Sequence, residues 1–156
     1  MTHKERRDRE TSNRRLLKLA AKLRTVDKDH FRYSRWGGVN ESGVPDVCGT
    51  NGCAIGWAST MPEFRRLGLR LVSGSGAKND WDQPTYPRLA GYETSGLEGT
   101  WDEAAMHVFK LSKDEAQFLF LPNDRSSSFV WKAPGPSASP IAVAEHIERF
   151  VAERGS

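Results

Sequence analysis

Apolar residues in the first part of the chain recur at the three- and four-residue spacing of a helix. Leu16 and Leu19 lie on one side of such a helix, and lysines and arginines flank them. Ser12 or Asn13 can cap the first turn, so the pattern predicts a helix that starts there and ends near Thr25. One side of this helix should cover the core, and the other should meet water.

The middle of the chain alternates between glycine-rich loops and short apolar segments. Residues 37–52 contain Gly-Gly, Ser-Gly and a proline, which is typical of a long loop. The next segment, residues 53–61, predicts a helix that Pro62 stops or bends. Residues 69–72 favour a strand, and residues 85–92 favour a second extended segment that its prolines restrict to a sheet edge.

Two capping boxes mark helix starts in the second half of the chain. In each box a Thr or Ser precedes a Glu by three residues, so that side chain and backbone can exchange hydrogen bonds. Thr100 and Glu103 form the first box and predict a helix through Leu111. Ser112 and Glu115 form the second box and predict a helix that ends before the next proline.

The last element completes a fold that is rich in helices. After a connection at residues 122–138, Ser139 supplies a cap and Pro140 the first residue of an amphipathic helix. Together the segments predict an α+β, helix-dominated domain of four or five helices with a small antiparallel sheet. We expect residues 12–153 to form this single globular domain and residues 1–11 to form a flexible basic N-terminal arm.

Charge is distributed unevenly along the 156 residues. Residues 1–35 hold 12 Lys and Arg against 5 Asp and Glu, whereas the remainder holds 11 against 15, for a net charge of +3. A basic first helix on a mildly acidic body can meet phosphates or an acidic protein surface. The alternative is a solvated, charge-rich helix, and the acidic residues interleaved with the basic ones favour it.

The chain shows no sign of a membrane or secretory address. No apolar run approaches the roughly 18 to 20 residues that cross a bilayer, and the charged start is unlike a secretory signal. The protein is therefore expected to be cytoplasmic and to have no membrane partner. Its two cysteines should be thiols, because the cytosol keeps cysteines reduced.

One stretch, residues 47–58, combines both cysteines with a glycine-rich turn that leads into an apolar segment. Backbone N–H groups before a helix start favour an anion, and the glycines allow close approach. The loop lacks the lysine of a P-loop, and its polar residues can also act as plain helix caps. The candidate ligand-binding residues are Cys48, Gly49, Thr50, Asn51, Gly52, Trp57, Trp36 and Trp81.

Cys53 is the candidate nucleophile of an alternative, enzymatic interpretation. A thiol at a helix start can ionise near neutral pH, and His107 would be the imidazole that activates it. The alternative is that Cys53 packs as a small apolar residue and that His107 is a half-exposed helix residue. A zinc site at the Cys-x4-Cys spacing lacks a second Cys/His pair, so neither a metal nor another cofactor is predicted.

These residues resemble a recurrent type of small protein found in phages, prophages and bacteria. The signature that carries the resemblance is Cys48-Gly49-Thr50 followed by Cys53-Ala54-Ile55-Gly56-Trp57-Ala58. The resemblance extends over most of residues 12–153 and implies a small cytoplasmic accessory protein of mobile-element origin. Many such proteins counter host defence by binding a protein or a signalling nucleotide. By analogy, the resemblance implies a function of this kind here.

Three functions follow from the sequence. The first is a non-enzymatic accessory binding protein that uses residues 46–57 to bind a host protein or a nucleotide signal. The second is a cysteine-dependent hydrolase or transferase that uses Cys53 and His107. The third is nucleic-acid binding through the basic N-terminal helix.

Overall fold

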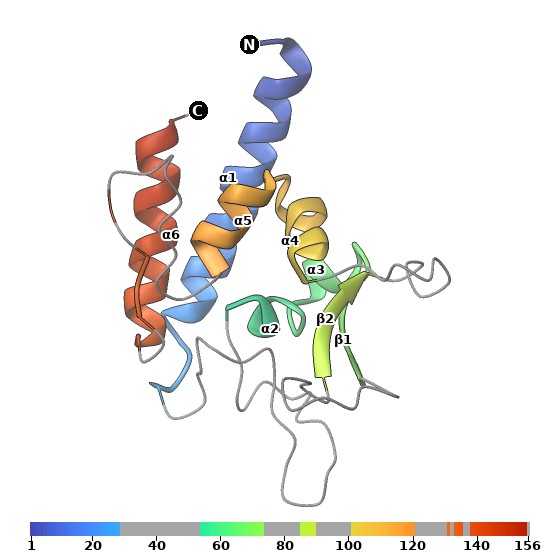
Figure 1. The fold of residues 1–156 in the computed structure, drawn as a ribbon, viewed down its shortest axis with the longest axis vertical. Coiled ribbons are helices and arrows are strands. Elements are labelled where there is room, and N and C mark those ends of the chain that lie inside the picture. The colour runs from blue at the N-terminus through green and yellow to red at the C-terminus, as the bar shows by residue number, and fades with distance from the viewer. Residues whose placement is uncertain are drawn as a thin grey trace, which may run out of the picture.

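The computed structural model describes residues 1–28, 54–73, 85–89, 101–120, 131, 133–135 and 138–155. Within these ranges the chain forms helices and one short pair of strands (Figure 1). None of the described helices is both long and apolar enough to cross a membrane. In chain order the elements are α1 (His3–Leu23), α2 (Ala54–Ala58), α3 (Pro62–Arg65), β1 (Leu69–Ser73), β2 (Thr85–Leu89), α4 (Trp101–Phe109), α5 (Lys113–Phe120) and α6 (Pro140–Arg154).

α1 starts earlier than the hydrophobic pattern predicts. Thr2 caps the helix, because its hydroxyl accepts a hydrogen bond from the Glu5 amide at 3.1 Å and the Glu5 carboxylate accepts one from the Thr2 amide at 2.6 Å. The predicted start at Ser12 or Asn13 is therefore wrong. Both residues lie in the middle of a helix of 21 residues, whose charged first half consists largely of good helix formers.

The core lies where α1 packs along α6 and against α4. α1 and α6 run side by side in opposite directions (Figure 1). Leu16, Leu19 and Leu23 of α1 are fully buried, and each such side chain contributes about 1.5 to 3 kcal/mol of transfer free energy. The buried Phe109 packs against two other aromatic rings, with its ring centroid 5.0 Å from that of Phe64 and 5.6 Å from that of Phe120.

The prediction of an α+β fold with an antiparallel sheet is wrong, because helices build the whole framework of the described residues. Helices of 21, 5, 4, 9, 8 and 15 residues stand against two strands of five residues each. β1 and β2 pair antiparallel, with Leu69 opposite Leu89 and Ser73 opposite Thr85. One such ladder is too small to form a layer or to stand without helices beside it. The described part is thus α-helical in class, and it has six helices instead of the predicted four or five.

The helix predicted at residues 53–61 is shorter in the structure, where α2 covers Ala54–Ala58. α2 ends at Ala58, and the hydroxyls of Ser59 and Thr60 bond back to backbone carbonyls, with Ser59 Oγ 2.5 Å from the Gly56 oxygen. A new helix, α3, then begins with Pro62 in its first turn. The loop predicted before this segment, at residues 37–52, lies outside the described residues.

The later helices begin as their caps predict. Ser112 Oγ accepts from the Glu115 amide at 3.2 Å, and Glu115 Oε1 accepts from the Ser112 amide at 2.9 Å, which confirms the second capping box. Ser139 Oγ accepts from the Ala142 amide at 3.1 Å, with Pro140 in the first turn of α6, which confirms the last helix start. The first predicted box, at Thr100, lies outside the described residues.

Candidate functional site

Only two of the residues predicted to form a site, Trp57 and His107, lie in the described part of the chain. The others belong to ranges that the structure does not describe, so their roles stay predictions. These residues are Cys48, Gly49, Thr50, Asn51, Gly52, Cys53, Trp36 and Trp81.

Trp57 lies in α2 and packs against the edge of the hydrophobic core. Its side chain is half-buried, and Lys22 Nζ of α1 lies 5.7 Å from the centroid of its ring. A cation over an indole face is an attractive contact. The structure thus brings a residue of the predicted loop site beside the C-terminal end of the basic first helix.

His107 lies on the exposed side of α4. Its neighbours Ala105, Val108 and Phe109 are fully buried, whereas the imidazole faces water. Within the described ranges His107 has no hydrogen-bond partner or ion-pair partner, and no group of three metal-ligating side chains occurs there. Its pairing with Cys53 remains a prediction.

The most extensive polar feature is a row of cations along α1, here called the basic stripe. At about 3.6 residues per turn its members fall within about 100° of the helix circumference, away from the buried leucines. The acidic residues of α1 lie outside this arc, and the row extends over about 27 Å of helix at 1.5 Å per residue. The basic stripe consists of Lys4, Arg7, Arg14, Arg15, Lys18 and Lys22.

Most of the charge on the basic stripe is not neutralised. Within the described residues, Lys4, Arg7 and Arg14 have no ion-pair partner. Lys18 Nζ lies 3.7 Å from Glu63 Oε1, a contact between side chains that are 58% and 33% exposed. Exposed pairs of this kind contribute only about 0 to 1 kcal/mol. The stripe therefore keeps a positive potential that an anion can use.

Arg15 ties the stripe to the body of the protein. Its Nη1 donates a hydrogen bond to the Val108 carbonyl at the end of α4, at 2.7 Å. Burial, and to a smaller degree the charge of Arg14, lowers the pKa of Arg15, but a guanidinium stays charged in proteins. Arg15 thus orients α1 while still contributing to its positive side.

A small pocket opens in the middle of the basic stripe. It has a volume of about 170 Å³. Three cations and one carboxylate line it, so its surroundings are net positive by two charges. An anionic group of a partner would enter a pocket of this kind more readily than a cation or a neutral group. The lining residues are Arg14, Arg15, Lys18, Glu63, Phe64 and Leu67.

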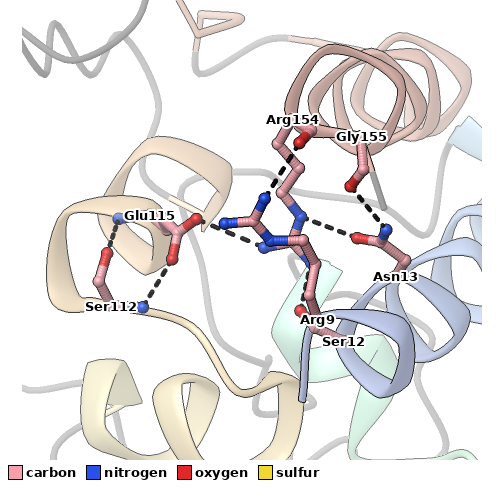
Figure 2. Close-up of polar contacts among 7 residues, drawn as sticks. All are labelled: Arg9, Ser12, Asn13, Ser112, Glu115, Arg154 and Gly155. Carbon is pink, nitrogen blue, oxygen red and sulfur yellow. Dashed lines mark hydrogen bonds and ion pairs between the residues drawn. The ribbon is translucent and has the colours of Figure 1, made fainter. Parts of the chain in front are cut away.

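A second cluster of polar residues holds α1, α5 and α6 together around Arg154 (Figure 2). Arg154 Nε donates to Asn13 Oδ1 at 2.7 Å, Nη2 to Ser12 Oγ at 2.5 Å, and Nη1 to Glu115 Oε2 at 3.3 Å. Burial lowers the pKa of Arg154, and the charge of Glu115 partly opposes this effect. Every group in the cluster has a partner, which indicates a structural role.

The larger pocket beside this cluster has no charge preference. Its volume is about 390 Å³, and three cations and three carboxylates line it together with Met1. The ion pairs Lys110–Asp8 and Arg154–Glu115, both at 3.3 Å, already use four of the charged groups. The basic stripe is therefore the stronger candidate site.

A buried histidine that the sequence did not single out joins α5 and α6. His146 is 5% exposed; Trp131 Nε1 donates to its Nδ1 at 3.1 Å, and its Nε2 lies 2.8 Å from the Phe118 carbonyl. An indole N–H only donates, so Nδ1 accepts and the proton lies on Nε2. Burial, followed by the nearby charge of Arg149, lowers the pKa of His146, against the opposing effect of the bond to Phe118. The imidazole is a neutral core group with both nitrogens used.

No protein-family model matches the chain, and no curated protein or solved structure is significantly similar to it. The resemblance to small phage and prophage proteins therefore remains a prediction from the residues that carry it.

Proposed function

We propose that this protein acts by binding an anionic partner along the basic stripe of α1. The observation that carries the proposal is a row of six cations around a positively lined pocket, of which only Lys18 has an ion pair among the described residues. Lys and Arg in such a row gain affinity by releasing counterions from a polyanion. A row of about 27 Å is longer than a single nucleotide needs, so a polyanion fits it best.

The settings of His107 and His146 support binding in preference to catalysis. His146 uses both ring nitrogens in hydrogen bonds inside the core, and His107 is exposed without a partner among the described residues. A catalytic histidine that acts as a general base must lie within hydrogen-bond reach of the group from which it takes a proton, and a second group usually orients its ring. Neither imidazole has that setting in the described part of the chain.

The biological setting is part of the same proposal. We propose that it is a small cytoplasmic accessory protein of phage or prophage origin that counters host defence by binding a host component. The exposed cations of the basic stripe would suit a negatively charged component. Trp57 and Lys22 lie together at one end of the basic stripe. Trp57 is the described member of the predicted site at residues 46–57, which we propose to bind a host protein or a signalling nucleotide.

The proposal is tested by removing charge from the basic stripe without changing the fold. The variant K4Q/R7Q/R14Q should elute from immobilised heparin at markedly lower salt than the unchanged protein, because three cations that can contact the anionic groups of heparin are lost. A matched control, K28Q/R66Q/K113Q, removes the same charge from exposed positions outside the basic stripe, where the described residues form no ion pair with these side chains. Equal elution of the two triple variants would contradict the proposal, and circular dichroism would confirm that both are folded.

A further inference from the structure

The N-terminal end of α1 projects from the body of the protein. Residues 1–7 are exposed, with Met1 and Glu5 at the edge of the pocket beside the Arg154 cluster, and Ser12 is the first buried residue. Figure 1 shows this end extending beyond α4, α5 and the C-terminal end of α6. A free-standing end of a helix can enter a groove, which a helix lying flat on a surface cannot do.

The projecting end is held rigidly at its base. Asp8 Oδ1 forms an ion pair with Lys110 Nζ at 3.3 Å, and Arg9 Nη1 donates a hydrogen bond to the Arg154 carbonyl at 3.3 Å. Arg154 in turn bonds Ser12 and Asn13 in the adjoining turn (Figure 2). The capping box of Thr2 closes the far end. The helix is thus presented already ordered, which reduces the entropy lost on binding.

Positive charge lies on two sides of the projecting end, and the Glu5 carboxylate, which accepts a hydrogen bond from the Thr2 amide, lies between them. Lys4 and Arg7 belong to the basic stripe, and helical geometry places Arg6 about 160° around the helix from Lys4. Cations on both sides of a helix can face both phosphate rows of a groove. Arg14 and Lys18 continue on the same side as Arg7, where they would meet the backbone as the helix leaves the groove.

Resting on the proposed function, we propose that the polyanion is double-stranded DNA and that the projecting end of α1 enters its major groove. An α-helix with side chains is about 10–12 Å across, and the major groove of B-DNA is about 12 Å wide and 8.5 Å deep. The deep and narrow major groove of duplex RNA does not admit side chains. Phosphates contacted by Arg14 and Lys18 fix the position of the protein without reading sequence.

Fluorescence anisotropy tests this inference with a labelled 20-bp DNA duplex, a 20-nucleotide single strand and a 20-bp RNA duplex. The DNA duplex should bind at least about 10-fold more tightly than the other two at the same salt concentration. The variant K4Q/R6Q/R7Q should lose about 10-fold or more of the duplex affinity, and its log–log salt slope should become less steep by about 3. The control K28Q/R66Q/K113Q should change neither quantity as much.

Chemical probing locates the groove. Guanine N7 faces the major groove, so bound protein should protect N7 from dimethyl sulfate, and K4Q/R6Q/R7Q should abolish the protection. Equal affinity for single strand and duplex, or binding without N7 protection, would overturn the inference. If K4Q/R7Q/R14Q still weakens heparin binding in that case, the proposed function stands without it. If neither heparin nor DNA is bound, both fail.

Discussion

Around Arg154, on the side of α1 that faces α6, the polar groups are at least partly buried and all have partners. Along the basic stripe most of the cations are exposed and have no ion pair among the described residues. Arg154 and Arg14 show the contrast between two arginines. The guanidinium of Arg154 donates to three side chains on two helices, and Arg14 has no partner in the described residues. A buried charge needs such partners because losing water costs free energy. An exposed one keeps its charge for a partner molecule.

Removing the hydrogen bonds of Arg154 should have the largest effect on stability. R154M should lower the free energy of unfolding by about 2–4 kcal/mol, since Ser12, Asn13 and Glu115 would lose their common donor. Urea denaturation measures the loss. R154K, which keeps the charge but not the planar set of donors, should lose less. A variant R154M as stable as the unchanged protein would show that the cluster does not hold the helices together.

Acid should weaken the contacts of the buried His146. Because burial lowers the pKa of His146 in the folded state below the ordinary value of 6.5, the unfolded chain takes up a proton that the folded chain does not. The stability due to this residue is therefore complete above about pH 6.5 and is lost as the pH falls toward the folded-state pKa.

The variant H146Q measures this effect, because it removes the titrating group and leaves other ionisable groups in place. Urea denaturation at pH 7.5 and 5.5 should show a smaller loss of stability in H146Q than in the unchanged protein. At pH 7.5 the variant H146A should cost about 1–3 kcal/mol, since the Trp131 N–H and the Phe118 carbonyl would lose their partner. An identical pH dependence in H146Q and the unchanged protein would contradict the assignment of a neutral imidazole.

The smallest expected effect concerns Glu63, the carboxylate that pairs with Lys18 of the basic stripe. E63Q removes a negative charge from the positively lined pocket and releases Lys18. Affinity for duplex DNA should rise about two- to five-fold, with stability changed by less than about 1 kcal/mol. E153Q removes a charge from an exposed position on α6 and is the matched control. Equal gains in both variants would indicate an effect of net charge alone.

Local signals predicted the later helices well. The Ser112–Glu115 capping box and the Ser139–Pro140 pair act within one turn of the chain, so the residues that form the helix start are adjacent in sequence. The start of α1 was missed although Thr2 and Glu5 form the same kind of box, because the apolar stripe that drew the prediction begins only at Leu16. The capping box was the better guide to the end of this helix.

The candidate site was predicted in part. The excess of Lys and Arg near the N-terminus is visible in the sequence, but whether these cations are paired depends on residues such as Glu63 of α3. The contact between Lys22 and Trp57 joins residues 35 positions apart. Interleaved acidic residues made a plain solvated helix the favoured interpretation, and only helical geometry shows that the acids lie outside the basic stripe.

The sequence by itself determined the amphipathic helices, two of their caps and the basic character of the first helix, because these properties depend on neighbours within a few residues. Tertiary structure alone decided that helices and not a sheet form the framework, and which polar groups are buried. Ser12 and Arg154 are 142 residues apart, and His146 and Phe118 are 28 apart. A local pattern shows which side of a helix turns inward, but the partner opposite is chosen by packing and by the need to satisfy each buried polar group.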